Sequence, residues 1–282
     1  KNGYGRNFLL KTGKALRANK ENIELVNKKK TELNKKNTEI KLELKEIEKK
    51  IDKKVLKFSK EAKVNPIISE CAQVAEYAEN NLNLNNFERN KFNELLKTRF
   101  VKYKELFIEA GELTELEWEF LAAISFQESQ WDYRAKSNMG VRGLMMLTQQ
   151  TAKSLGISNR IDPRNSVIGG SRHLADIFKS IDYAQTESDK INFALATYNL
   201  GATNINNARA KLDTGSSLIR WDDLKAELIL IDGEALYFKA QDGYSRGQQA
   251  IDFVERTREY TVLMNLASCQ DSINQLTSAS GI

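Results

Sequence analysis

The apolar run at residues 118–129 constrains the fold of this chain more than any other segment. It has the length and composition of a buried helix, and Glu128 falls four and seven residues after Ile124 and Leu121, on the face that such a helix would bury. A carboxyl group on that face loses hydrating water, which disfavours its ionised form and suits a general acid. The alternative is that Glu128 lies at the helix end and reaches back to solvent, as most acidic residues do.

A glycine-containing turn and a short helix follow. In residues 137–148 two glycines flank a basic residue and lead into a compact apolar segment. Thr148 is expected to be the N-cap of the short helix and Gly156 its C-terminal stop, with Ala152 and Leu155 facing inward.

Residues 191–201 predict a further helix that ends at Gly201. Tyr198 lies on its apolar face, where spacing alone indicates a core tyrosine. Asn199, beside Gly201, can be read as an ordinary helix-terminating residue.

These three segments, in this order, resemble the catalytic domain of the lytic transglycosylases, which are lysozyme-like enzymes that cleave the glycan strands of peptidoglycan. The resemblance rests on the following motifs: Glu128-Ser129, Gly143-Leu144-Met145-Met146 and Tyr198-Asn199. It is nearest to the membrane-bound lytic murein transglycosylase F subgroup, through residues 140–148, 236–239 and 243–247. A segment similar to the closing helix of the family, residues 253–260, extends the resemblance to about residues 87–268.

Two positions depart from the usual family pattern. Met146 stands where many relatives have a glutamine that binds an N-acetyl group, a departure that the F subgroup shares, and Thr197 stands where an alanine usually precedes the tyrosine. The first departure leaves the sugar contacts open, and the second is mild.

The resemblance implies cleavage of the β-1,4 bond between MurNAc and GlcNAc. Glu128 would protonate the glycosidic oxygen and then, as a carboxylate, remove the proton from the C6 hydroxyl of the same MurNAc, which leaves a 1,6-anhydro end. A single carboxylate suffices when the N-acetyl group of the sugar takes the second role.

The resemblance also implies the residue roles. Glu128 and Tyr198 are the expected catalytic residues. The expected substrate-binding residues are Ser129, Gly143, Leu144, Met145, Met146, Asn199, Tyr244 and Tyr260. Each aromatic candidate, including Trp131, Tyr237 and Phe238, can equally be a core residue.

Three other functions stay open at this point. The same scaffold could be a muramidase that lets water attack. If the helix of Glu128 continued, Asp132 would share its face and a two-carboxylate retaining hydrolase would be feasible, whereas a helix that has ended would leave Asp132 to cap a turn. A non-catalytic scaffold that binds the cell wall is the third alternative.

Composition excludes other chemistries. The 282 residues are 41% hydrophobic with two prolines, which indicates a helix-rich chain with a substantial core, and no apolar run approaches the ~18 residues of a membrane span. His173, Cys71 and Cys269 are too few and too scattered for a metal cluster, so we expect neither metal nor cofactor. His173 is expected to be structural, and the sequence does not decide whether the cysteines pair. Because Lys1 is followed by no leader, we expect a mature or trimmed form.

The basic charge is concentrated at the front of the chain. Residues 1–64 have a net charge of +11, and the rest of the chain has −6. Apolar residues there recur in steps of three and four, which predicts a coiled coil or helical hairpin. Its lysines form either a solvated surface or a surface that binds the anionic envelope, and the helices are candidates for self-association. Nucleic acid is not expected, because aromatic residues are not interleaved with the lysines.

The expected organisation is all-α. A basic helical extension occupies residues 1–64, and a short helix with an asparagine-rich linker follows at 65–86. Residues 87–270 form the lysozyme-like catalytic domain, of the goose-type or soluble-lytic-transglycosylase kind, and residues 271–282 a flexible tail. Peptidoglycan is the expected partner, and the periplasm or the outer membrane the expected location.

Overall fold

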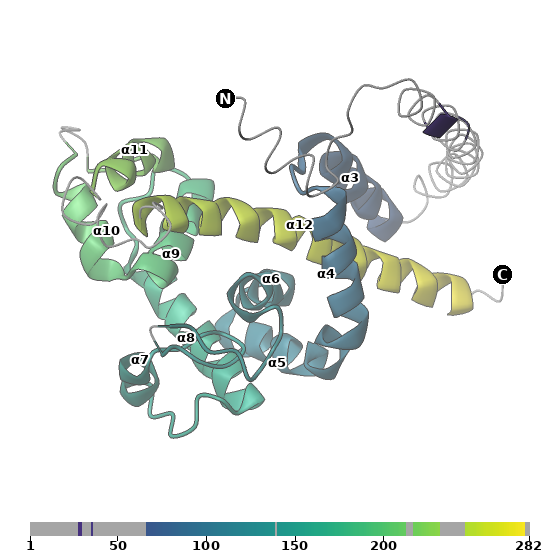
Figure 1. Cartoon of the computed structure of the whole chain (residues 1–282), viewed down its shortest axis with the longest axis horizontal. Coiled ribbons are helices and arrows are strands. Elements are labelled where there is room, and N and C mark those ends of the chain that lie inside the picture. Colours follow the sequence, from purple (N-terminus) through teal and green to yellow (C-terminus); the bar gives the residue numbers. More distant parts are fainter. Residues whose placement is uncertain are drawn as a thin grey trace. The chain divides into compact units, whose positions relative to one another are not determined.

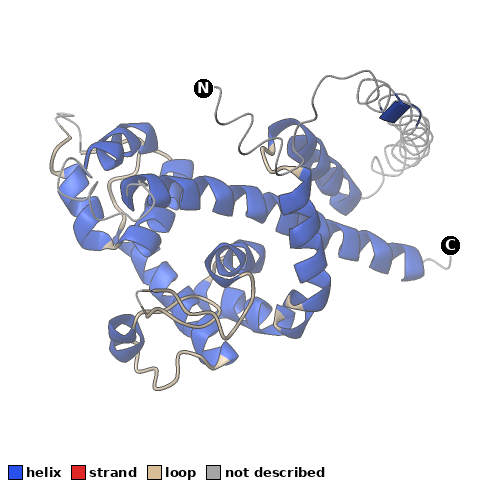
Figure 2. Cartoon of the chain, in the orientation of Figure 1, coloured by secondary structure: helices blue, strands red, loops and turns tan. Residues whose placement is uncertain are grey.

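The computed structural model describes residues 66–138, 140–212, 217–231 and 246–279, together with residues 28, 29 and 35. Regular secondary structure in these residues is helical (Figure 2), and three isolated β-bridges lie outside the helices. The prediction of an all-α fold is confirmed for this part of the chain. The elements are α3 (Pro66–Asn81), α4 (Asn86–Thr98), the 3-10 helix η2 (Phe100–Lys102), α5 (Lys104–Thr114), α6 (Trp118–Ser129), α7 (Gln149–Ser154), α8 (Pro163–Ser180), α9 (Glu187–Leu200), α10 (Ala202–Arg209), α11 (Trp221–Ile231) and α12 (Arg246–Ala279).

Helix α6 is the centre of the core. Every side chain from Leu121 to Phe126 is at most 3% exposed, which is expected for a helix that is apolar on nearly all sides. Helices α5 and α12 both pack against α6, and α8 and α9 complete the enclosure by packing against α5, α12 and each other. Figure 1 shows α6 nearly end-on between α12 and α5. Helix α6 therefore places the residues that follow this buried segment against the interior of the protein.

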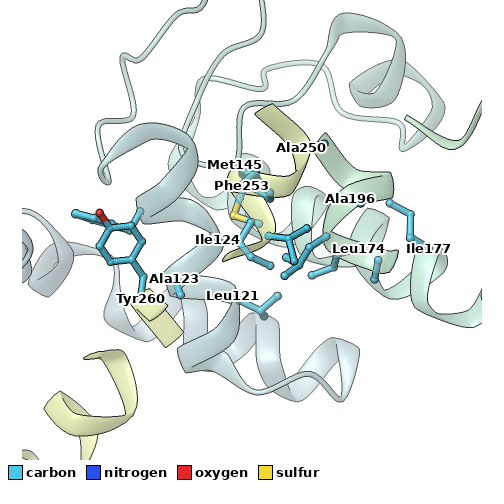
Figure 3. Packing of buried hydrophobic residues seen from close by; sticks show 14 of the residues in the cluster. Leu121, Ala123, Ile124, Met145, Leu174, Ile177, Ala196, Ala250, Phe253 and Tyr260 are labelled. Carbon is cyan, nitrogen blue, oxygen red and sulfur yellow. The ribbon is translucent and has the colours of Figure 1, made fainter. Parts of the chain in front are cut away.

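The main hydrophobic contacts of α6 are shown in Figure 3. Leu121 and Ile124 are fully buried, as are Met145 from the loop before α7 and Leu174 from α8. Full burial of each such side chain contributes about 1.5–3 kcal/mol relative to exposure. This packing fixes α6 against the loop that carries Met145.

An aromatic cluster closes the end of α6. The ring of Phe126 lies 4.7 Å from that of Trp131 and 4.5 Å from that of Tyr260, and the Trp131 Nε1 donates a hydrogen bond of 3.0 Å to the Ala122 carbonyl. Gln130 and Trp131 have positive φ angles of 52° and 56°, so the chain leaves the helix at this point. Trp131 is a core residue here, at 1% exposure.

Several predicted helix ends are confirmed. The Thr148 hydroxyl accepts from the Thr151 backbone N–H at the start of α7, and α9 ends at Gly201, whose φ is 90°. Helix α8 begins in a similar way, with the Asp162 side chain accepting from the Asn165 backbone N–H and Pro163 as the first helical residue. Ala152 is buried as expected.

The described residues from Glu70 onward form one compact unit, and a disulfide cross-links it near its beginning. Cys71 in α3 is bonded to Cys269 in α12, so the two cysteines of the sequence pair. Helix α12 continues to Ala279, where a flexible tail from residue 271 was expected. Among the described helices none is both long and apolar enough to cross a membrane.

The basic extension predicted for residues 1–64 lies outside the described residues, apart from positions 28, 29 and 35.

The disulfide generates the first prediction. It closes a loop of 198 residues, and such a cross-link restricts the unfolded chain, so we expect the Cys71→Ser/Cys269→Ser variant to unfold about 2–4 kcal/mol more easily in urea. Dithiothreitol should lower the unfolding midpoint of the wild type and leave that of the variant unchanged. Equal midpoints for wild type and variant without reductant would contradict the prediction.

Candidate active site

A cleft of about 730 Å³ opens beside the end of α6. Its walls come from α6, the loop before α7, α8, α9 and the start of α12. The described residues that line it are Glu128, Ser137, Asn138, Val141, Met146, Leu147, Thr148, Thr151, His173, Ile177, Thr197, Tyr198, Asn199, Leu200, Gly201, Ala202, Arg246 and Gln249. Glu128 is the one carboxylate in this set.

Glu128 is held in its protonated form by its surroundings. Helix α6 places it after the buried segment and at the cleft wall, with protein atoms around most of the side chain. Burial raises the pKa of the Glu128 carboxyl to about 8, because the ionised form loses its hydration. At neutral pH this group can therefore donate a proton.

The raised pKa predicts how stability depends on pH. The folded state binds the Glu128 proton more tightly than the unfolded state does, so wild-type stability should fall as pH rises from about 4.5 to about 8. The Glu128→Gln variant lacks this titration. We expect its unfolding midpoint, measured by thermal denaturation between pH 4 and 9, to exceed that of the wild type increasingly as pH rises through this window. A difference that does not vary with pH would show that Glu128 ionises normally.

Tyr198 of α9 faces the same cleft. Its hydroxyl donates a hydrogen bond of 2.7 Å to the Met145 carbonyl. Burial, and then the nearby Glu128, raise the pKa of the Tyr198 hydroxyl well above its ordinary value, so it remains a donor throughout the physiological range. Tyr198 thus connects α9 to the loop that forms the cleft wall.

The loop at residues 143–147 is also tied to α6. The hydroxyls of Ser125 and Ser129 both donate to the Leu144 carbonyl, each at 2.9 Å. Ser129 thereby joins the end of the helix to the loop, one residue after Glu128. Every one of these partners is buried, and leaving a buried partner unpaired costs about 1–3 kcal/mol.

The same loop is fastened to α8. The Met145 backbone N–H donates to the Ser166 hydroxyl at 3.1 Å. Gly143 has a φ of 88°, and a Cβ atom there would lie 2.2 Å from the Arg160 carbonyl, so only glycine fits. The loop therefore bonds to α6, α8 and α9 through two consecutive residues, Leu144 and Met145.

Gly170 of α8 permits the close approach of the loop and Tyr198. A Cβ atom at this position would lie 2.5 Å from the Met145 Cβ and 3.1 Å from the Tyr198 hydroxyl oxygen. Alanine here would push the loop away from α8.

We expect Gly170→Ala to lower the free energy of unfolding in urea by about 1–3 kcal/mol, because an added methyl group overpacks the contact with Met145. The neighbouring Ser171→Ala is the control, since the buried Ser171 hydroxyl has no hydrogen-bond partner in the described part of the chain and its removal should leave stability equal or slightly higher. Unchanged stability of Gly170→Ala would mean that Met145 moves aside freely.

The expected substrate-binding residues fall into two groups. Met146 and Asn199 line the cleft. Ser129, Gly143, Leu144 and Met145 are buried behind its wall, where they hold the loop in place instead of facing a ligand. Substrate contacts were predicted for these four residues, and in the structure they support the loop instead.

Of the two aromatic substrate-binding candidates, Tyr260 and Tyr244, the structure describes Tyr260. Tyr260 is 8% exposed, packs against Phe126 and Phe92, and does not line the cleft, which corrects the expectation of a sugar contact. Tyr244, Tyr237 and Phe238 lie outside the described residues.

Asp132 is not a second catalytic carboxylate. The helix ends at Ser129, and the Asp132 Oδ1 accepts from the Arg134 backbone N–H at 3.0 Å, so Asp132 caps a turn. It is absent from the described lining of the cleft. The alternative of a retaining hydrolase with Glu128 and Asp132 is thereby excluded.

Sequence reasoning missed part of the cleft wall. His173, expected to be structural, lines the cleft with its ring 5.7 Å from that of Tyr198, and burial lowers the pKa of its imidazole. Arg246 and Gln249, in the first turn of α12, line it as well. The position of His173 three residues after Gly170 was the available signal, because paired glycines on α8 indicate a close approach by another element.

The region that holds this cleft matches a known domain family. Residues 105–217 match the family model described as Transglycosylase SLT domain. These residues contain Glu128, the tied loop and Tyr198, so the chain carries a transglycosylase SLT domain, as the sequence motifs predicted.

Several curated proteins that share one name are similar to this chain. The chain is 39% identical over 170 residues to the membrane-bound lytic murein transglycosylase F of Ectopseudomonas mendocina, a match that covers 60% of this chain and 35% of that protein. The proteins of the same name from Maricaulis maris and Enterobacter sp. are 39% identical over 175 residues and 42% over 168, covering 62% and 59% of this chain and 38% and 31% of theirs. The chain thus spans about a third of the length of these curated relatives.

Two further matches are more limited. A solved structure, an inactive mutant of the lytic transglycosylase Slt from Pseudomonas aeruginosa, aligns with a TM-score of 0.41 at 18% identity, over 57% of this chain and 24% of that one. A second family model, described as Ribosomal protein L9, N-terminal domain, matches residues 1–26, which lie outside the described residues.

Proposed function

We propose that this chain is a peptidoglycan lytic transglycosylase that cleaves the β-1,4 bond between MurNAc and GlcNAc and leaves 1,6-anhydroMurNAc ends. The observation that carries the proposal is Glu128, a carboxyl group with a pKa of about 8 in a cleft of about 730 Å³. Its place within a transglycosylase SLT domain, and the names of the relatives, support the choice of substrate.

The proposed reaction uses Glu128 twice. Its carboxyl donates a proton to the glycosidic oxygen as the bond to the leaving sugar breaks. The resulting carboxylate then takes the proton of the C6 hydroxyl of MurNAc, and that oxygen attacks C1 of the same sugar. A well-oriented internal nucleophile has an effective molarity of up to about 10⁵ M or more, so it outcompetes water.

One carboxylate is sufficient for this scheme. A second carboxylate is dispensable when the N-acetyl oxygen of the substrate stabilises the positive charge that develops at C1. The described lining offers Glu128 as its single carboxylate, which agrees with substrate assistance.

The remaining wall residues position the sugar. Tyr198 gives its hydroxyl proton to the Met145 carbonyl, so in this arrangement it holds the wall beside Glu128 and does not itself supply a proton. Asn199 is exposed in the cleft and offers an amide to sugar hydroxyls or the acetamido group. Met146, with a φ of 47°, presents an apolar thioether in place of the amide that many relatives use.

A muramidase on the same scaffold is the second candidate. It would differ only in that water, not the C6 hydroxyl, attacks C1, so the product alone separates the two reactions.

The principal test is the Glu128→Gln variant, which keeps the shape of the side chain and removes the proton donor. We expect cleavage of purified peptidoglycan sacculi to fall by at least about 10³-fold, while binding to the sacculi is retained. Glu119→Gln is the matched control, because it makes the same change on α6 away from the cleft and should leave cleavage intact.

Mass spectrometry of the products released by the wild type completes this test. Anhydro-muropeptides support the proposal, and reducing ends would assign the muramidase reaction instead. Undiminished cleavage by the Glu128→Gln variant would eliminate Glu128 as the acid.

The proposed location is the periplasm, with attachment to the outer membrane. The relatives are named as membrane-bound, and the Cys71–Cys269 disulfide is a bond that persists in oxidising compartments. For residues 1–64 we keep the proposal of a basic helical extension that binds an anionic envelope surface or a second copy of the chain, supported by its net charge of +11.

A further inference from the structure

A second, polar pocket of about 440 Å³ lies next to the candidate active site. Three cationic residues line it: Lys136, Arg142 and Arg160. Hydroxyl and amide side chains make up much of the remaining wall, including Ser158, Asn159 and Gln149. Among the described residues of this lining there is no carboxylate, so the pocket has an excess of three positive charges.

The three cations lack acidic partners among the described residues. None of them takes part in the ion pairs of this part of the chain, although both arginines are only partly exposed. The Arg160 Nη1 donates to the Leu147 carbonyl at 2.8 Å, which fixes the guanidinium at the pocket wall and leaves its other N–H groups available. Partly buried cations without a counter-charge attract an anion.

The pocket is built from the same loop as the cleft. Ser137 and Asn138 of this loop line the cleft, whereas Lys136 and Arg142 line the pocket. Backbone pairing of Arg142 with Lys136 and with Leu147 holds the part of the loop that lines the pocket to the part that lines the cleft. The loop is drawn tan between α6 and α7 in Figure 2.

The cleft and the pocket also meet at one residue. Thr148 lines both of them, so a ligand that occupies the cleft beside Glu128 passes directly beside the pocket. An anionic group that branches from a bound glycan strand can enter the pocket without leaving the strand.

We propose that this pocket binds a carboxylate of the peptide that branches from the glycan strand, and so makes the enzyme prefer strands that carry peptides. The proposal rests on the proposed function, since it names a specificity determinant of the same substrate.

The chemistry of the pocket matches this ligand. Guanidinium groups bind carboxylates through paired N–H donors, and a lysine ammonium adds a third charge-assisted contact. The peptides of peptidoglycan carry free carboxylates, whereas the sugars of the strand hold their anionic group in the bond to the peptide. The phosphate of a separate wall polymer would suit the same cations, so the experiment includes an arm that distinguishes it from a peptide carboxylate.

The test measures binding with the full chain in the Glu128→Gln background, so that no substrate is consumed. Two probes are compared: soluble glycan strands that carry their peptides, and the same strands after an amidase has removed the peptides and the lactyl carboxylates that this exposes have been converted to neutral amides. We expect the dissociation constant for stripped strands to exceed that for peptide-bearing strands. Adding Lys136→Gln and Arg142→Gln should reduce this ratio about tenfold, as expected for the loss of charge-assisted hydrogen bonds.

Lys153→Gln is the matched control. It removes the same charge from α7 at an exposed position outside the pocket, and the ratio should remain that of the parent. An unchanged ratio in the Lys136→Gln/Arg142→Gln variant, or equal weakening for both probes, would overturn the inference. A defect that disappears when phosphate polymers are first removed from the strands would overturn it in favour of a phosphate ligand.

The outcome is separable from that of the proposed function. Because binding is measured without cleavage, a wild type that cleaves no sacculi would refute the lyase reaction while the ratio still decides the role of the pocket. If the wild type does cleave, its preference for peptide-bearing strands should weaken in the double variant and fall further when Lys136→Glu replaces Lys136→Gln in that variant, because the pocket then loses one more positive charge.

Discussion

The cleft depends on a short set of hydrogen bonds to the backbone of Leu144 and Met145. Two serines of α6, one serine of α8 and Tyr198 of α9 converge on these two residues. Since the bonds are buried, they hold three helices and one loop in a fixed relation that no single helix contact would impose. Both the wall of the cleft and the wall of the cationic pocket follow from the position of this loop.

The burial that fixes this arrangement also sets the chemistry of Glu128. The carboxyl follows a segment of α6 that is enclosed on all sides, and among the described residues no basic neighbour lowers its pKa. The fold thereby gives up stability above pH 4.5 to keep a proton at the cleft, which is the usual relation between a strained or desolvated site and function. Tyr198 shares this environment, and its proton is used for structure.

The sequence predicted helices and helix ends well, because periodicity and capping residues determine them locally. It predicted less well which way a side chain faces, because tertiary packing determines that. The helix of Glu128, the Thr148 cap and the Gly201 terminus follow from periodicity and capping, and all are present. Ser129 illustrates the opposite case, because whether a serine at a helix end faces a ligand or a carbonyl depends on a loop fifteen residues later. Tyr260 was predicted to bind substrate and His173 to be structural, whereas Tyr260 lies in the core and His173 lines the cleft. An aromatic ring at helical spacing can face either the core or a cleft, and the positions of its neighbours decide which.

The bond between Cys71 and Cys269 has a consequence for survival in a compartment that contains proteases. It encircles the whole transglycosylase domain from before α4 to the second half of α12. A single backbone cut anywhere inside that circle leaves both fragments covalently attached, so the pieces cannot diffuse apart and the packed helices can stay assembled.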